Sequence, residues 1–307
     1  RISMPEKFIN MTIIMEFLFM GFPDDWMLQR LYATLFLLTV MGNLLIIIIT
    51  TTDQHLQVPM YFFLKNLSFI DICCISVTLP KPIMNSLNNS HSISFLGCAM
   101  QVFLFVLSFG TEYALLIVMS YDRYAAICHP PHYEGIMHRG ACVQMATASW
   151  LSGCVYGAIH VAGTFSISFC GSNIVHQFFC NTPSLLMLSC YGEHILEDTF
   201  IILSCCLVFV CFLMVVSYVH IFTTVLRIPS VKIRQKTLST CLSHLTLVIL
   251  FLFSGSITYF AKNIKSSYLK LLISVLYTVL SPTLNPLIYS LRNKDMQTAL
   301  GKVIVIK

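Results

Sequence analysis

Two acidic residues, Asp71 and Glu112, each lie in the middle of a long apolar stretch of the sequence. A carboxylate surrounded by hydrocarbon is costly, so its presence there is by default a sign of function. If both stretches cross one membrane, the carboxylates lie at a similar depth and repel each other unless a proton or a cation lies between them. Their oxygens suit a hard cation. The alternative is that each is hydrogen-bonded to neighbours such as Asn43 or Asn285.

Glu112 belongs to a stripe of residues that recur at helical steps of three and four. In a helix this stripe forms one face, with an aromatic outer section, a mid-depth carboxylate and an inner arginine. At 1.5 Å per residue its ends are about 27 Å apart. Because the carboxylate must avoid lipid, we expect this face to point into a helix bundle. The stripe consists of Phe105, Phe109, Glu112, Leu116, Met119 and Arg123.

Asp122-Arg123 lies where this stretch reaches the inner surface. The pair is either an ordinary interfacial ion pair with a snorkelling arginine or a latch that opens to admit a cytoplasmic partner. A later stretch contains Asn285-Pro286, and a proline inside a helix removes a backbone hydrogen bond and bends the helix. We expect Asn285 to bond to the groups freed there, in either a static kink or a hinge.

The composition shows which kind of scaffold holds these groups. Of the 307 residues, 57% are hydrophobic and 10% are charged, and the mean hydropathy is +0.80. A soluble domain carries roughly 25% charged residues, so an ordinary soluble enzyme is excluded. Seven stretches are long and apolar enough to cross a membrane as helices. They are residues 28–50, 59–86, 95–127, 141–161, 196–226, 233–259 and 268–291.

An odd number of spans places the two termini on opposite sides of the membrane. Lys and Arg are more numerous in the inner segments if the N-terminus lies outside, which favours that orientation. The sequence therefore predicts an all-α membrane protein, a seven-transmembrane helix bundle with its N-terminus outside. Its parts are an extracellular N-terminus (1–27), which carries a glycosylation sequon at Asn10, the transmembrane domain (28–291) and a cytoplasmic tail (292–307).

Other classes of membrane protein fit the sequence less well. A transporter would show an internal repeat and broken helices that face each other, and the sequence shows neither. A retinal-binding proton pump needs a lysine in the seventh helix, where the mid-helix residue is Thr278. No catalytic motif favours an enzyme.

Thirteen cysteines are present, and most lie within the predicted spans as small apolar side chains. Cys98, Cys170, Cys180 and Cys190 lie on the predicted outer side. In an oxidising compartment they can form disulfides in three different pairings. The rival interpretation is a metal site at His176 and Cys180, but no second His/Cys pair stands at zinc spacing.

A set of motifs extends over almost the whole chain. The most specific are MSYDRYAAIC at 119–128, KTLSTC at 236–241 and SHL at 243–245. The others are EF at 16–17, GF at 21–22, GN at 42–43, PMYFFL at 59–64, LSFID at 67–71, SY at 217–218 and PTLNPLIYSLRN at 282–293. With these motifs the chain resembles the olfactory receptors, in their tetrapod-type branch, which belong to the rhodopsin-like G-protein-coupled receptors. It departs from the family at 251–253, where FLF replaces the frequent Phe-Tyr-Gly.

The resemblance implies a receptor rather than an enzyme, in the plasma membrane of olfactory cilia. It implies a stimulatory (olfactory) G protein as partner, a rise in cAMP, no nucleic-acid partner and no cofactor apart from a sodium ion. It also implies disulfides Cys98–Cys180 and Cys170–Cys190, a sodium-type site at Asp71 and Glu112, and a short amphipathic eighth helix at 293–305. The residues implied in activation and coupling are Asp122, Arg123, Tyr124, Tyr218, His244, Asn285, Pro286 and Tyr289.

Side chains that project inward from the outer halves of the helices should line a ligand cavity. They are almost wholly apolar, and no charge lies near Phe105, so we expect a small, mostly apolar, volatile ligand with one hydrogen-bonding group rather than an amine. The alternative is a rhodopsin-like receptor for a non-volatile small molecule or a peptide, expressed outside the nose. The candidate ligand-binding residues are Phe105, Val106, Phe109, Gly110, Ile202, Leu203, Cys206, Leu252, Gly255, Tyr259 and Thr278.

Overall fold

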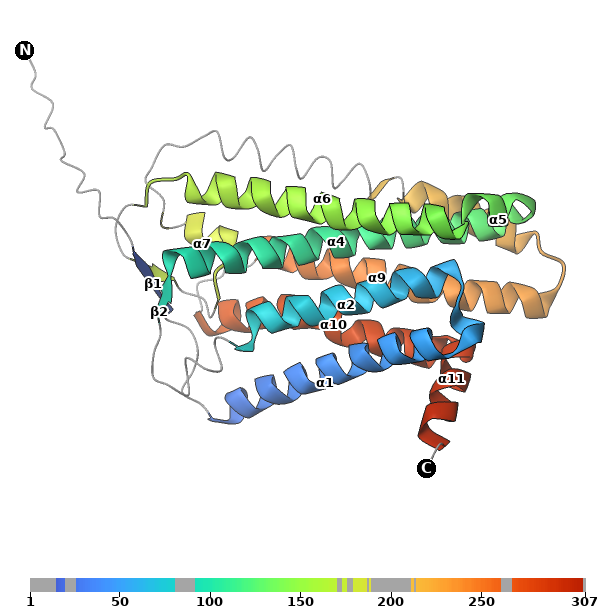
Figure 1. The fold of residues 1–307 in the computed structure, drawn as a ribbon, viewed down its shortest axis with the longest axis horizontal. Coiled ribbons are helices and arrows are strands. Elements are labelled where there is room, and N and C mark those ends of the chain that lie inside the picture. Colours follow the sequence, from blue (N-terminus) through green and yellow to red (C-terminus); the bar gives the residue numbers. More distant parts are fainter. Residues whose placement is uncertain are drawn as a thin grey trace, which may run out of the picture.

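The computed structural model describes residues 15–19, 26–80, 92–169, 173–175, 179–186, 188, 211–212, 214–260 and 267–305. These residues form an elongated bundle of long helices that run side by side (Figure 1). A small sheet lies at one end of the bundle, and the C-terminal helix α11 lies at the other (Figure 1). The carboxylates of Asp71 and Glu112 are therefore held by long helices that run side by side with the rest of the bundle.

The helices of the structure coincide with the predicted stretches. They are α1 (Trp26–Thr52), α2 (Pro59–Thr78), α4 (Phe95–Cys128), α6 (Arg139–Phe165), the helical segment Met214–Leu226, α9 (Val231–Phe260) and α10 (Ser267–Arg292). Within the described ranges, four segments are long and apolar enough to cross a membrane: Gln29–Thr52, Pro59–Thr78, Phe95–Cys128 and Val231–Phe253. Parts of the predicted second and fifth stretches, 81–86 and 196–210, lie outside the described residues.

Helices α4 and α6 approach each other closely because α6 carries glycines at the contact. A Cβ on Gly153 would lie 2.1 Å from Thr111 Oγ1 and 2.7 Å from the carbonyl oxygen of Leu107. A Cβ on Gly157 would lie 3.1 Å from the carbonyl oxygen of Phe103. Small residues at such contacts let two backbones come together inside a membrane. The close approach fixes which face of α6 turns toward α4.

Two prolines interrupt the hydrogen bonding of α10, and α1 supplies a replacement donor. Pro286 has no N–H to donate to the carbonyl oxygen of Pro282, four residues earlier. Asn43 donates from Nδ2 to that oxygen at 2.9 Å. A Cβ on Gly42 would lie 3.2 Å from Pro286 Cβ, so the two helices are in close contact here. Asn43 on α1, and not Asn285 as expected, bonds to the freed carbonyl.

A three-stranded sheet at the outer end joins three distant parts of the chain. Strand β1 (Glu16–Phe19) lies between β2 (Ser92–Ser94) and β3 (Ile174–Val175), antiparallel to β2 and parallel to β3. Phe17 pairs with Ile93, and its side chain is fully buried in a hydrophobic cluster that also contains Val106 and Cys180. The N-terminal strand is therefore part of the same packed unit as the outer end of α4.

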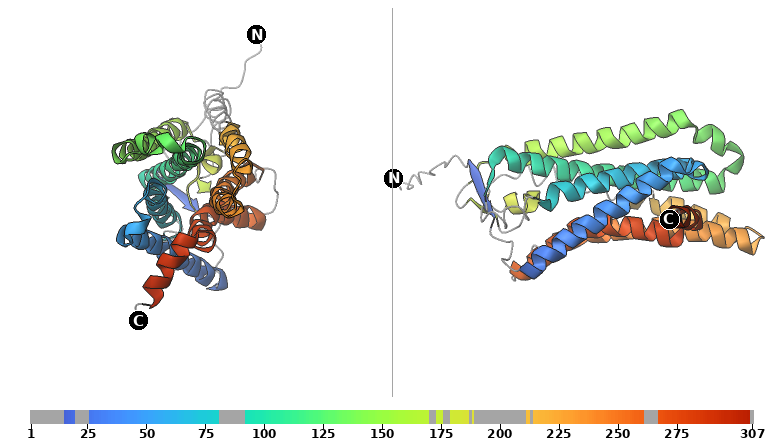
Figure 2. Two further views of the ribbon diagram at one scale, coloured as in Figure 1. Left: turned by 90° about the vertical axis from the view of Figure 1, so that its right-hand side faces the viewer. Right: turned by 60° about the horizontal axis from the view of Figure 1, so that its bottom comes forward.

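At the inner end, α11 (Lys294–Val305) turns away from the direction of the bundle (Figure 2). Asn293 starts this helix, since its Oδ1 accepts the backbone N–H groups of Asp295 at 3.0 Å and Met296 at 3.3 Å. The hydroxyl of Tyr61 donates to the same oxygen at 3.1 Å. Met296 is buried while its neighbours on the opposite side are exposed, as predicted for an amphipathic helix.

Short helices complete the loops. They are the 3₁₀ helices Gln54–Leu56 and Pro130–His132, α5 (Tyr133–Ile136) and α7 (Thr182–Leu186). Asp53, in the loop between α1 and α2, forms an ion pair with Lys302 of α11 at 2.9 Å. The hydrogen bond from Lys302 and a second one from the backbone N–H of His55 lower the pKa of the Asp53 carboxyl below its ordinary value. The pair ties α11 to the loop between α1 and α2.

Candidate functional site

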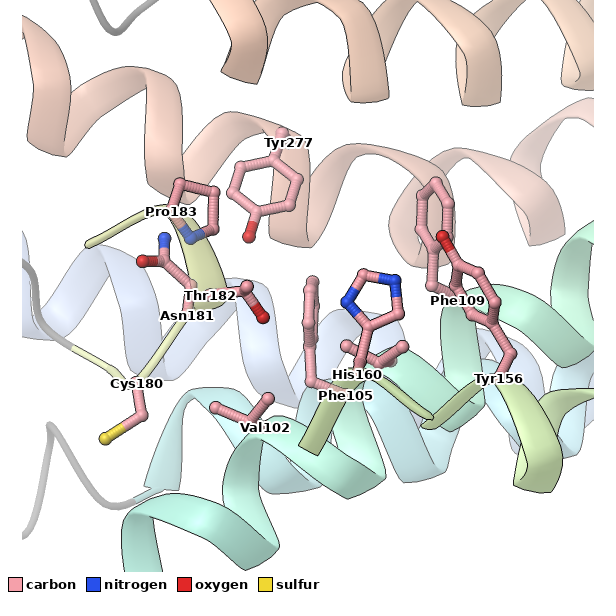
Figure 3. A pocket seen from close by; sticks show the side chains of 11 residues that line it. Val102, Phe105, Phe109, Tyr156, His160, Cys180, Asn181, Thr182, Pro183 and Tyr277 are labelled. Carbon is pink, nitrogen blue, oxygen red and sulfur yellow. The ribbon is translucent and has the colours of Figure 1, made fainter. Parts of the chain in front are cut away.

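A cavity of about 180 Å³ lies near the outer end of the bundle. Its walls come from α4, α6, α10 and the segment that follows Cys180, as Figure 3 shows. None of the described residues that line it is Asp, Glu, Lys or Arg. The lining residues are Val102, Phe105, Val106, Phe109, Tyr156, His160, Cys180, Asn181, Thr182, Pro183 and Tyr277.

Aromatic rings of α4 form the main apolar surface of the cavity. The ring of Phe105 lies 5.5 Å from Phe179 and 5.8 Å from Tyr277, between centroids. The ring of Phe109 stacks on Phe251 of α9 at 4.4 Å. These contacts hold the rings in fixed orientations, so a ligand would meet a preformed apolar wall.

The segment after Cys180 covers the cavity and is fixed at several points. A disulfide joins Cys180 to Cys98 at the start of α4, as the family resemblance implied. The backbone N–H of Cys180 donates to Gln101 Oε1 at 2.9 Å, and Gln101 Nε2 donates to the carbonyl oxygen of Val77 at 3.0 Å. Asn181 Oδ1 accepts the N–H of Ser184 at 3.1 Å and so starts the short helix α7.

The predicted ligand-binding residues fall into three groups. Phe105, Val106 and Phe109 line the cavity. Gly110, Leu252 and Thr278 do not line it. Gly110 is at the contact with α6, where a Cβ would lie 3.2 Å from Tyr156 Cδ1 and 3.3 Å from Gly153 Cα. Leu252 packs against the central core, and Thr278 is buried next to the lining residue Tyr277. Ile202, Leu203 and Cys206 lie outside the described residues, and at Gly255 and Tyr259 only the helical backbone is described.

Sequence reasoning missed the contribution of α6 and of the 180–183 segment. Tyr156 and His160 are one helical turn apart on α6 and both line the cavity, with their rings 4.5 Å apart. Their spacing of four, next to the glycines that face α4, is the signal that could have found them. For the 180–183 segment the useful signal is Cys180 itself, because a disulfide to α4 brings the residues after it to the top of that helix.

The two buried carboxylates lie around one amide. Asn285 donates from Nδ2 to Asp71 Oδ2 at 2.8 Å and to Glu112 Oε1 at 3.4 Å. Ser281 also donates to Glu112 Oε1. The other oxygen of Asp71, Oδ1, is buried and has no hydrogen-bond partner among the described residues. The cluster therefore combines hydrogen-bonded neighbours with a carboxylate oxygen that is available to a proton or a cation.

At the inner end of α4, Asp122 and Arg123 form an ion pair. The hydroxyl of Tyr133, in α5, donates to the other oxygen of Asp122 at 2.8 Å. Burial and the neighbouring Asp122 raise the pKa of Tyr133, so its hydroxyl keeps its proton at neutral pH. Both oxygens of Asp122 are thus bonded. The hydroxyl of Tyr124 lies 3.3 Å from Nε2 of His129.

Two further predicted activation residues, on different helices, face each other. Tyr218 and His244 share a hydrogen bond between the hydroxyl and Nδ1, and both side chains are buried. On α10, the hydroxyl of Tyr289 is directed at the sulfur of Met119 at 4.0 Å. These three side chains are therefore engaged in two separate contacts, one between Tyr218 and His244 and one between Tyr289 and Met119.

The remaining site predictions concern residues that the structure does not describe. Asn10, Cys170, Cys190 and His176 fall outside the described ranges. Within those ranges, no group of three or more His, Cys, Asp or Glu side chains is arranged to hold a metal ion. The predicted sodium-type site at Asp71 and Glu112 contains two such side chains.

Comparison with known proteins decides the family. The family model described as "Olfactory receptor" matches residues 32–307. This chain belongs to the olfactory receptor family. Human olfactory receptor 14A16 is 54% identical over 301 residues, which cover 96% of this chain and 97% of the relative. Human olfactory receptor 14L1 is 52% identical over 300 residues, which cover 95% and 92%. This olfactory receptor is therefore a multi-pass membrane receptor and not an enzyme.

The fold of this olfactory receptor agrees with that assignment. Squid rhodopsin superimposes with a TM-score of 0.67 at 19% sequence identity, covering 93% of this chain and 87% of that one. At this identity the likeness concerns the fold alone. Together with the family, it confirms the predicted fold class, an all-α membrane protein with a seven-transmembrane helix bundle.

Proposed function

We propose that this olfactory receptor binds small, mostly apolar, volatile ligands in the cavity between α4, α6 and α10. It then activates a stimulatory G protein and raises cAMP, in the membrane of olfactory cilia. The observation that carries this proposal is the cavity itself, which is about 180 Å³ in volume, aromatic on one side and without Asp, Glu, Lys or Arg among its described lining residues. Mostly apolar pockets bind by contact area and shape, with a few polar groups to fix orientation.

Signalling follows from a shift between two states of the bundle. The ligand binds the active state more tightly than the resting state, and the inner end opens in response. The contacts of Asp122 with Arg123 and Tyr133 favour the closed state, because a charge pair in a low-dielectric site is costly to separate. A G protein that binds the open state has to raise ligand affinity in return.

We further propose that a sodium ion binds between Asp71 and Glu112. The buried oxygen Asp71 Oδ1, which lacks a protein partner among the described residues, supports this assignment. Two carboxylates near one amide also favour a bound positive charge, since they repel each other when both are ionised. The bound ion would supply that charge, and Asn285 would orient both carboxylates.

The test is a cAMP assay in cells that express this chain together with the olfactory stimulatory G protein, challenged with a broad panel of volatiles. We expect a dose-dependent rise with wild type. The variant Arg123→Ala should abolish it while surface staining remains close to wild type. A preserved response at equal surface staining would remove Arg123 from the mechanism. Silence of the wild type at good surface staining would favour a non-volatile ligand or another coupling.

A further inference from the structure

We propose that Thr182 anchors the ligand through a single neutral hydrogen bond, so that the preferred ligand is an uncharged molecule with one oxygen function on an apolar body. This inference rests on the proposed function, because it takes the cavity described above as the ligand site. It assigns the polar contact to the segment after the cysteine bridge, rather than to the membrane helices.

The hydroxyl of Thr182 is buried and unpaired. The residue is 8% exposed, and its Oγ1 has no hydrogen-bond partner among the described residues. Thr182 lines the cavity together with Phe105, and Figure 3 shows its hydroxyl directed into the cavity. A buried hydroxyl without a partner carries a desolvation cost, and a ligand oxygen that bonds to it removes that cost.

The position of this hydroxyl is fixed before a ligand arrives. The neighbouring Cys180 is held by its disulfide to Cys98 and by the bond from its N–H to Gln101. Asn181, directly before Thr182, accepts the backbone N–H of Ser184, two residues after Thr182, so the segment is also held across Thr182. Because the donor is already in place, less entropy is lost when a ligand binds.

The rest of the cavity limits the charge and size of the ligand. With no Asp, Glu, Lys or Arg among the described lining residues, a carboxylate or an ammonium group would be buried without a counter-charge. A cavity of about 150 Å³ holds a molecule the size of benzene. The volume here, about 180 Å³, therefore suits a compact body against Phe105 and Phe109 with one hydroxyl or carbonyl oxygen toward Thr182.

The probes for the test form a series of matched length: n-hexane, hexanol, methyl butyl ketone, hexanoate and hexylamine. Binding to the purified full chain is measured as the ligand-induced rise in melting temperature, which does not depend on signalling. Potency is measured separately as the cAMP response at matched surface staining. The two readouts keep failure of ligand binding distinct from failure of G-protein coupling.

We expect hexanol and the ketone to raise the melting temperature of wild type more than the other probes do. In Thr182→Val this advantage should disappear, with a rise of about three- to tenfold in the concentration needed for half-maximal response, the effect of losing one neutral hydrogen bond. Thr182→Ser should retain the advantage, because it keeps the hydroxyl. Thr164→Val is the matched control, since Thr164 is a buried threonine whose hydroxyl also lacks a described partner but does not line the cavity.

Three results would overturn the inference. One is an unchanged preference for hexanol and the ketone in Thr182→Val. Another is an equal loss in Thr164→Val, and the third is tighter binding of hexanoate, hexylamine or n-hexane to wild type. If the melting shifts follow the expected pattern but cAMP does not rise, Thr182 is supported as the anchor and the proposed coupling is wrong.

Discussion

The outer and inner parts of helix α4 use polar groups in opposite ways. On the outer part, Phe105 and Phe109 face a cavity with aromatic walls and with the hydroxyl of Thr182, which has no hydrogen-bond partner among the described residues. On the inner part, Glu112 and Asp122 bond to side chains of other elements. Under the proposed function, the outer part receives a ligand from outside, whereas the inner part holds the bundle in one state.

This difference predicts two patterns of response to change. Apolar contact is worth about 0.8 kcal/mol for each buried methylene, so changes in the cavity should have graded effects that depend on the ligand. Breaking one partner of a buried charge pair leaves the other uncompensated and costs about 3–5 kcal/mol. Changes at the inner part should therefore affect signalling strongly and for every ligand.

The largest effect should come from the α4–α6 contact, which supports both parts. Gly153→Ala places a methyl group 2.1 Å from Thr111 Oγ1 and 2.7 Å from a backbone oxygen, so the helices have to separate. We expect most of the surface staining to be lost, together with the response to all ligands. Gly135→Ala is the control, because nothing lies within 4 Å of a Cβ there. Normal surface delivery of Gly153→Ala would show that this contact does not position the two parts.

The next effect concerns the sodium ion proposed between Asp71 and Glu112, where the inner part of α4 begins. In membranes with wild type, replacing Na⁺ by N-methylglucamine at constant ionic strength should change agonist potency by at least about fivefold. In Asp71→Asn the two media should give the same potency, because the carboxylate oxygen that would bind the ion is gone. Asp53→Asn, an acidic residue of the inner loop, should behave as wild type. Equal sodium dependence in wild type and Asp71→Asn would contradict the proposal.

A smaller, ligand-dependent effect is expected from the cavity wall. Phe105→Leu removes ring contacts with Phe179 and Tyr277 and enlarges the cavity. Within a homologous series of ligands, we expect the optimum chain length to increase by about one methylene, with potency changes of about fourfold. The measurement is dose–response for each homologue at matched surface staining. An equal loss of potency for every homologue would contradict this prediction, because that is the pattern expected for the inner residues.

The smallest effect should come from the exposed pair of Lys302 and Asp53. The pKa of Asp53 is lowered in the folded protein, so the pair contributes above the ordinary pKa of 3.8 and its contribution is lost as the pH falls through the lowered value. Lys302→Ala should therefore give a small, constant drop in melting temperature from about pH 5 to pH 8. A difference that grew toward pH 8 would show that another titrating group is involved.

Much of the fold followed from the sequence. The apolar stretches predicted the long helices because each must supply about 20 apolar residues to cross a membrane. The steps of three and four on α4 predicted an inward face, and Phe105, Phe109 and Glu112 do face the interior of the bundle. The cysteine pair Cys98–Cys180 came from the family resemblance, since four outer cysteines alone leave three pairings open.

The tertiary structure decided how each helix is rotated against its neighbours. A periodic pattern gives the angle between residues of one helix, but it does not say which neighbour a given residue meets. Thus Tyr277 lines the cavity where Thr278 was expected, and α6 contributes Tyr156 and His160 because its glycines set the approach to α4.

The same limit applies to the polar groups. The sequence determined that buried carboxylates and a proline-containing helix exist and have to be satisfied inside the membrane. Only the packing of α1 against α10 decided that Asn43 bonds to the carbonyl freed by Pro286, which leaves Asn285 to the carboxylates. A side chain's chemistry is fixed by its type, whereas its partner is fixed by the distances that helix packing allows.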